Sequence, residues 1–120
     1  MTNVLVVEDD TKLANVLEEK LTKTGFYVSV CHNGQEGLDK LKVEKFNIVL
    51  LDLLMPIKDG YEFLESYLNI THYFLPIIVL TNLSEFSSKM KVFKRGVISY
   101  MVKADVSMED IVDKIKELAR

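Results

Sequence analysis

The chain has a single cysteine, Cys31, so no internal disulfide can form, and this cysteine usage fits a reducing compartment. Cys31 lies in the apolar run 27–31, where we predict a buried small side chain rather than a nucleophile. Arginine is also scarce: Arg95 and Arg120 are the only two, and the net charge is −3. A DNA-binding domain of this size usually carries clustered basic residues, so we expect no direct binding of nucleic acid.

Long apolar runs are missing as well. No stretch approaches the roughly 18 apolar residues of a membrane-spanning helix, and no basic segment followed by an apolar one opens the chain. We therefore expect a soluble, cytoplasmic protein with no membrane partner. Low-complexity tracts, internal repeats and linkers are absent too. With 48% hydrophobic residues, the 120 residues suit one compact domain over 1–120.

What the chain does contain is a regular alternation of apolar runs and amphipathic stretches. The predicted strands are 3–7, 27–31, 47–51, 76–80 and 99–102. The predicted helices cover 11–23, 61–68 and 84–95, with two more opening after the N-cap residues Asn33 and Ser107. We predict an α/β fold: a doubly wound five-stranded parallel sheet, flavodoxin-like, with strand order 2-1-3-4-5 and helices on both faces.

Residues capable of chemistry follow four of these strands. The acidic run 8–10 follows the first strand, Asp52 the third, Thr81 the fourth and Lys103 the fifth. Ligands of such sheets bind at the carboxyl ends of the strands, so we expect these side chains to meet there. Carboxylates packed together repel one another unless a cation is present, and Mg²⁺ suits one or two carboxylates together with a phosphate.

These residue types together make a phosphoryl-transfer site. A carboxylate such as Asp52 can attack a phosphoryl donor beside a metal, while the Thr81 hydroxyl and the Lys103 ammonium contact phosphoryl oxygens. Each residue alone has an ordinary structural explanation, as a helix cap, a turn residue or a surface charge. Their occurrence at successive strand ends is what favours the functional interpretation.

Four segments, VVEDD, LLDLLMPIKDG, IIVLTN and YMVK, resemble the signature blocks of response-regulator receiver domains of two-component signal transduction. They stand in the right order and spacing over the full chain. The resemblance implies that Asp52 accepts a phosphoryl group from a sensor histidine kinase or a phosphotransfer protein. It also implies a Mg²⁺ cofactor, with Asp9 and Asp52 as direct ligands, Glu8 acting through water and Leu54 contributing its backbone carbonyl.

The resemblance further implies a switch. Thr81 and Lys103 would hold the phosphoryl group, and Tyr100 occupies the position of an aromatic residue that turns inward when Thr81 moves. The alternative for Tyr100 is a half-buried aromatic residue of a strand. Such a domain catalyses only its own phosphorylation and dephosphorylation and turns over no separate substrate. Opposite charges on helix 84–95 and the last helix would allow a phosphorylation-dependent homodimer.

Three departures from the family pattern matter, and one of them is Asp10, which stands where family members differ widely and is assigned no metal role. Asn82 replaces a small residue after the threonine, and Ala104 replaces the usual proline after the lysine. We predict a trans Lys103–Ala104 bond, because a cis bond without proline costs ~2.5–4 kcal/mol. Two family positions that flank the approach of water to the phosphoryl group are apolar here, Leu54 and Leu83, which predicts a long-lived phosphorylated form.

Three other functions compete with this interpretation. A haloacid-dehalogenase-like phosphatase needs a second aspartate two residues after the nucleophile, where this chain has Leu54. A flavodoxin-like cofactor binder needs a phosphate-cradling loop after the first strand, and the acidic run 8–10 would repel a phosphate. A pseudo-receiver, which keeps the fold and binds partners without being phosphorylated, remains the alternative.

Overall fold

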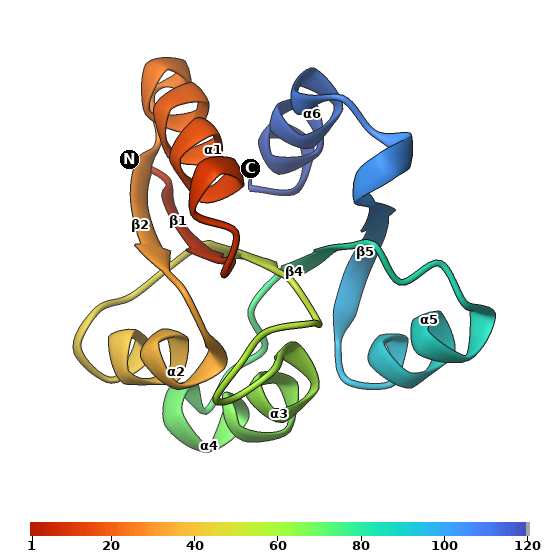
Figure 1. Cartoon of the computed structure of the whole chain (residues 1–120). Coiled ribbons are helices and arrows are strands. Elements are labelled where there is room, and N and C mark those ends of the chain that lie inside the picture. The colour runs from red at the N-terminus through yellow and green to blue at the C-terminus, as the bar shows by residue number, and fades with distance from the viewer. Residues whose placement is uncertain (120) are drawn as a thin grey trace.

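The computed structural model describes residues 1–119 and shows one parallel sheet between two layers of helices (Figure 1). Its strands are β1 (Asn3–Val7), β2 (Tyr27–Cys31), β3 (Ile48–Leu51), β4 (Ile77–Thr81) and β5 (Val97–Val102). The α-helices are α1 (Thr11–Thr24), α2 (Gly34–Val43), α3 (Gly60–Ser66), α4 (Leu68–Thr71), α5 (Phe86–Phe93) and α6 (Met108–Leu118), and a 3₁₀ turn, η1, covers Lys103–Asp105.

The sheet has the order β2-β1-β3-β4-β5 with every neighbouring pair parallel, which confirms the predicted fold and strand order. Helices α1 and α6 cover one face, and α2, α3, α4 and α5 cover the other (Figure 1). Within residues 1–119, no helix is both long and apolar enough to cross a bilayer.

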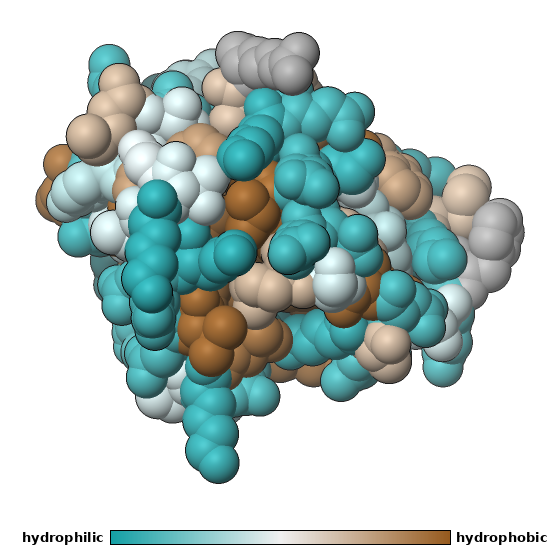
Figure 2. All heavy atoms as spheres, turned by 90° about the horizontal axis from the view of Figure 1, so that it is seen from above, coloured by the Kyte–Doolittle hydropathy of each residue, from teal (hydrophilic) through white to brown (hydrophobic). Residues whose placement is uncertain are grey.

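The central strands are buried on both faces because each alternates its side chains between two apolar cores. In β1, Val4 and Val6 pack with α1 and α6, whereas Leu5 and Val7 pack with α2 and α3. Strands β3 and β4 alternate in the same way. The outer side of the α1 and α6 layer is mostly hydrophilic, with apolar residues showing between the polar ones (Figure 2).

The helix starts follow the predicted capping pattern. Asn33 accepts a hydrogen bond from Glu36 N, and Ser107 forms a reciprocal capping box with Asp110. Asp59 forms a second capping box with Glu62 at the start of α3, directly after the loop that follows β3. These side chains satisfy backbone N–H groups that an α-helix leaves unpaired in its first turn.

The bounds of two predicted helices are wrong. The helix predicted over 84–95 forms only from Phe86 to Phe93. At its start, Leu83 is held in a hydrogen-bonded loop after β4 and no side chain caps the helix. The helix predicted to end at 68 continues as α4 to Thr71, since the intervening Tyr67 keeps helical angles and is fully buried.

Strand β5 also begins earlier than predicted. It starts at Val97, and the register with β4 shifts between Ile77 and Ile78, so that Ile98 lies in a bulge and is 49% exposed.

Candidate functional site

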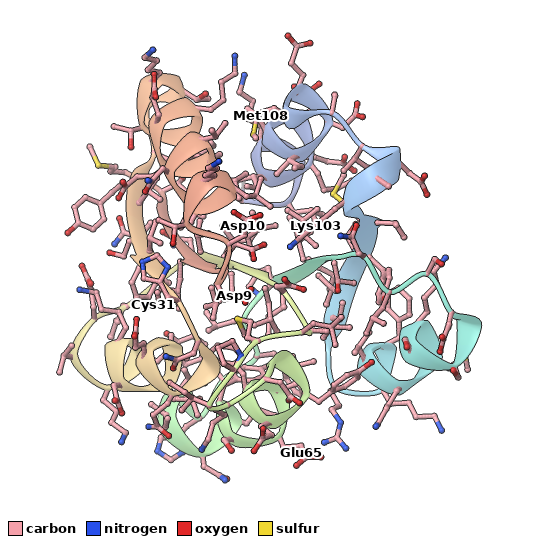
Figure 3. The ribbon with its side chains drawn as sticks, viewed as in Figure 1. Asp9, Asp10, Cys31, Glu65, Lys103 and Met108 are labelled. Atoms are coloured by element: carbon pink, nitrogen blue, oxygen red, sulfur yellow. The ribbon has the colours of Figure 1, made fainter. Side chains whose placement is uncertain are left out.

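The acidic residues meet at the carboxyl edge of the sheet because β1 and β3 are neighbours in register. Val7 pairs with Leu51, so Glu8 and Asp52 are the next residues at the same level. Figure 3 places Asp9 and Asp10 in the loop between β1 and α1, and Lys103 just beyond β5.

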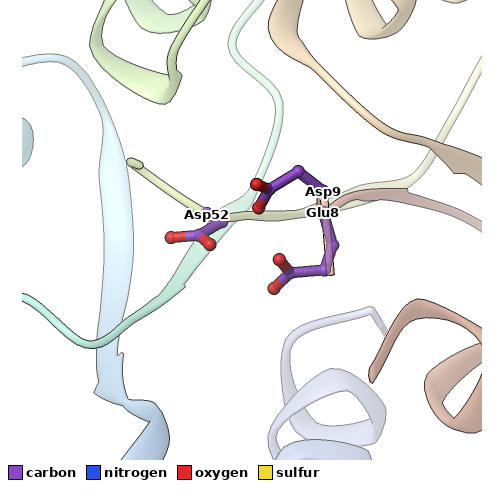
Figure 4. A group of neighbouring side chains, drawn as sticks. All are labelled: Glu8, Asp9 and Asp52. Atoms are coloured by element: carbon purple, nitrogen blue, oxygen red, sulfur yellow. The ribbon is translucent and has the colours of Figure 1, made fainter. Parts of the chain in front are cut away.

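Among the described residues, Glu8, Asp9 and Asp52 bring their carboxylate oxygens within 4.8 Å of one another (Figure 4). Glu8 and Asp52 are buried, whereas Asp9 is exposed. Asp10 has a different role, because its carboxylate accepts a hydrogen bond from Leu13 N and caps α1.

Lys103 is the cation that two of these carboxylates share. Its Nζ lies 2.8 Å from Glu8 Oε1 and 2.8 Å from Asp52 Oδ2. Burial acts to lower the pKa of Lys103, but the hydrogen bonds to Asp52 and Glu8 outweigh it, so the pKa is raised and the ammonium stays charged. The sequence predicted Lys103 at this site but did not predict the bridge to Glu8.

Glu8 is the carboxyl group whose ionisation the site perturbs most clearly. Burial raises the pKa of Glu8 from 4.5 to about 7. The hydrogen bond from Lys103 opposes this rise, and the charge of Asp52 adds to it. Glu8 therefore binds its proton more tightly in the folded chain than an ordinary glutamate does.

This raised pKa predicts a pH-dependent stability. The folded chain binds a proton at Glu8 more tightly than the unfolded chain does, so the free energy of unfolding should fall as the pH rises from 4.5 to about 7 and level off above it. The expected loss is roughly 1–3 kcal/mol. Urea unfolding without divalent cations measures it, and Glu8→Gln should flatten the slope. Equal slopes in both proteins would contradict the assignment.

Thr81 and Tyr100 are connected through one loop residue, Leu83. Thr81 is fully buried at the end of β4, and its Oγ1 accepts a long 3.5 Å hydrogen bond from Leu83 N. The Tyr100 hydroxyl, from β5, donates to the Leu83 carbonyl at 2.5 Å. A displacement of Thr81 would therefore act on the same loop that holds the Tyr100 side chain. The sequence predicted the two residues but not the backbone group that joins them.

The loop from Asp52 to Gly60 is fixed at both ends. At one end, the Asp52 amide donates to Val7 O at 3.0 Å and Leu54 N donates to the Asp52 carboxylate at 3.2 Å. At the other end, Gly60 N donates to Leu53 O at 3.1 Å. A Cβ at Gly60 would lie only 2.3 Å from the Asp52 carbonyl oxygen, so no other residue fits there without moving the backbone. The local sequence pattern does not predict this requirement.

The donor set fits a hard divalent cation. Three carboxylates supply oxygens, and the Leu54 backbone lies against the Asp52 carboxylate. The arrangement contains an excess of negative charge over the Lys103 cation, which a divalent ion would offset.

The peptide bond between Lys103 and Ala104 is trans, as predicted. The described residues contain no cis peptide bond.

A five-stranded parallel sheet of order 2-1-3-4-5, with an acidic cluster and a lysine at the carboxyl ends of its strands, defines the CheY-like class of signalling domains. The sequence model described as "Response regulator receiver domain" matches residues 4–116. The chain therefore belongs to the response regulator receiver domain family of two-component signalling.

Individual proteins agree with this assignment. The probable transcriptional regulator ycf29 of Porphyra purpurea is 34% identical over 117 residues, 97% of this chain and 56% of that protein. Response regulator ArlR of Staphylococcus haemolyticus (strain JCSC1435) is 32% identical over 120 residues, 100% of this chain and 53% of that protein. The chain thus spans about half the length of these curated relatives.

Solved structures show the same fold. A CheY-like receiver domain protein from Methanospirillum hungatei JF-1 has a TM-score of 0.91 at 28% identity, covering 99% of this chain and 94% of that one. The response regulator TrrA from Thermotoga maritima, solved in complex with Mg(2+)-BeF, has a TM-score of 0.84 at 28% identity. That match covers 98% of this chain and 99% of the TrrA chain.

Proposed function

We propose that this domain is a phosphorylation-dependent switch in which Asp52 accepts a phosphoryl group from a sensor histidine kinase or a phosphotransfer protein. The observation that carries the proposal is the cluster of Glu8, Asp9 and Asp52, with carboxylate oxygens within 4.8 Å of one another. Glu8 and Asp52 are buried and share one cation, Lys103, so two carboxylates are held together with a single positive charge. Such clusters of buried, interacting titratable groups are typical of functional sites.

Each residue of the site would have a separate role in the phosphoryl transfer. An Asp52 carboxylate oxygen forms a bond to phosphorus as the bond from phosphorus to the donor breaks, and the donor leaves with that electron pair. Lys103 already contacts Asp52 and would pair with a phosphoryl oxygen, while the Thr81 hydroxyl would donate to another.

Asp9 and Asp52 would hold Mg²⁺ directly, with Glu8 acting through water and Leu54 through its carbonyl. When bound, Mg²⁺ offsets the negative charge that develops on the transferring group. The domain would act on no separate substrate, catalysing only its own phosphorylation and dephosphorylation.

Intact mass spectrometry after incubation with acetyl phosphate tests the proposal. The wild-type chain should gain the mass of one phosphoryl group when Mg²⁺ is present and none when it is chelated. Asp52→Ala should gain none under either condition. A wild-type chain that gains nothing with Mg²⁺ and donor present would instead identify a pseudo-receiver, which binds partners without phosphorylation.

The surface formed by α5, β5 and α6 is the proposed output face. It exposes Phe93 and Ile98, and the half-buried Tyr100 ring lies 6.4 Å from Phe93 between ring centroids. Thr81 and Tyr100 would couple the phosphoryl group to this face, because both contact Leu83.

Opposite charges on α5 and α6 would support a phosphorylation-dependent homodimer through this face. Fewer basic side chains are free for such a contact than the sequence suggests. Arg95 pairs with Glu65 of α3, and the Lys91 ammonium lies over the Tyr61 ring. Lys94, the residue that ends α5, and Asp113 of α6 are exposed.

Sedimentation with and without beryllofluoride and Mg²⁺ checks the homodimer. We expect a larger species only with the phosphoryl mimic, and its loss in Phe93→Ser. A sedimentation coefficient unchanged by beryllofluoride at high protein concentration would point to a different partner.

A further inference from the structure

The loop from Asp52 to Gly60 has a strained apex. Ile57 has a φ of 68°, and Lys58 N donates to the Pro56 carbonyl at 2.8 Å. A hydrogen bond between residues i and i+2 around a positive central φ is the rarer and more strained form of γ-turn. A β-branched residue is poorly suited to this conformation. The Ile57 side chain is 81% exposed, so its own packing does not hold the turn in place.

The first turn of α2 provides the contact that the Ile57 side chain does not. Gly34 N donates to the Lys58 carbonyl at 2.6 Å. Since Lys58 N is bonded to Pro56, both backbone groups of Lys58 are occupied. Asn33 is buried and caps α2, so the helix end that holds Lys58 is itself fixed.

Gly34 is required by this close approach. A Cβ at position 34 would lie 2.6 Å from the Lys58 carbonyl oxygen and 2.9 Å from that of Asp59. Both are backbone atoms, so an added methyl group must displace the loop rather than rotate a side chain. Any larger residue at position 34 would therefore push on the chain between Asp52 and Gly60.

We infer that Gly34 is a positioning residue: its contact with Lys58 holds the strained γ-turn and thereby sets the place of the Asp52–Leu54 backbone. The loop is tied by Leu54 N to the Asp52 carboxylate and by Gly60 N to Leu53 O at 3.1 Å. With these ends fixed, the Gly34 contact at the apex removes most of the remaining freedom. The functional part of the inference rests on the proposed function, because that function uses the Asp52 carboxylate and the Leu54 carbonyl.

The test compares Gly34→Ala with Gly37→Ala, one turn along the same helix. A Cβ at Gly37 would meet core side chains instead of the loop, namely the Phe63 ring at 3.0 Å and Val7 Cγ2 at 3.1 Å. Both variants therefore lower the midpoint of thermal unfolding, but only Gly34→Ala shifts the amide resonances of residues 53–60. Its Mg²⁺ dissociation constant, from NMR titration well below the unfolding temperature, should rise roughly tenfold, as expected when support of a metal ligand is lost.

A second substitution separates positioning from general damage. Ile57→Gly lets the apex adopt positive φ without strain, so it should not lower the unfolding midpoint, and in the Gly34→Ala background it should return the Mg²⁺ affinity toward the wild-type value. Equal Mg²⁺ affinities for Gly34→Ala and Gly37→Ala, or no recovery with Ile57→Gly, would overturn the inference.

The readouts also distinguish the inference from the proposed function. If the wild type neither binds Mg²⁺ nor takes up phosphate, the proposed function fails, and the amide shifts still decide whether Gly34 positions the loop. If Gly34→Ala does not fold, hydrogen exchange of the wild type decides: an amide of Gly34 as strongly protected as those in the middle of α2 would support the inference, because a first-turn amide has no partner within the helix and Gly34 N donates to Lys58 O. Rapid exchange of the Gly34 amide would overturn it.

Discussion

Replacing Lys103 with methionine should lower the free energy of unfolding by roughly 3 kcal/mol at neutral pH in the absence of Mg²⁺. Methionine keeps much of the volume but removes the cation that lies 2.8 Å from both Glu8 and Asp52. The exposed fractions of these two side chains are 3% and 5%, so water cannot take over the role of the ammonium. The remaining carboxylates must then protonate or repel each other.

The matched control is Lys114→Met. Lys114 pairs with Glu117 at 3.4 Å on the outside of α6, where the two side chains are 34% and 65% exposed. Such pairs contribute about 1 kcal/mol or less. Urea unfolding should also show that lower pH, or added Mg²⁺, restores part of the stability of Lys103→Met alone. A similar loss in both variants would mean that Lys103 does not neutralise a buried site.

The phosphorylated form should be long-lived, and polar residues beside the site should shorten its lifetime. Hydrolysis needs a water molecule in line with the Asp52 phosphoryl bond. Leu54 and Leu83 flank that approach by family resemblance, and neither side chain can orient water. We expect Leu54→Asn and Leu83→Glu each to speed dephosphorylation by roughly tenfold or more, because positioning of the attacking group and exclusion of water change rates by orders of magnitude.

Decay of phosphoprotein after removal of the donor measures this effect. Leu54→Met is the control, since it keeps an apolar side chain of similar size on the same loop. Leu54 is 53% exposed, so none of these changes at position 54 should disturb the core. If phosphorylated Leu54→Asn and Leu83→Glu decay no faster than the phosphorylated wild type, the apolar residues do not control the lifetime.

Most of the fold could be predicted from local patterns. Central parallel strands are apolar on both faces, so β1, β3 and β4 appear in the sequence as continuous apolar runs within a residue of their observed ends. Helix α5 was predicted too long because its start depends on a long-range contact, the bond from the Tyr100 hydroxyl to Leu83 O. The early start of β5 depends on a bulge against β4, and periodicity carries no information about such a register shift.

In the site, too, some features could be predicted from the sequence and others depend on long-range contacts. The sheet topology brings Glu8, Asp9 and Asp52 together, so their meeting followed from the strand order. The bridge from Lys103 to Glu8 could not be predicted, because it depends on how far one side chain reaches across the sheet edge. The requirement for glycine at position 34 was equally hidden, since it arises from backbone atoms 24 or more residues away.

The central claim is that Asp52 is the phosphoacceptor, and chemical trapping of the acyl phosphate tests it most directly. Borohydride reduces an aspartyl phosphate to homoserine, which peptide mass spectrometry then locates in the chain. After incubation with acetyl phosphate and Mg²⁺, homoserine should occur at position 52 and at no other carboxylate, Glu8 and Asp9 included. Reduction at a different residue, or none in a chain that has gained phosphoryl mass, would contradict the account.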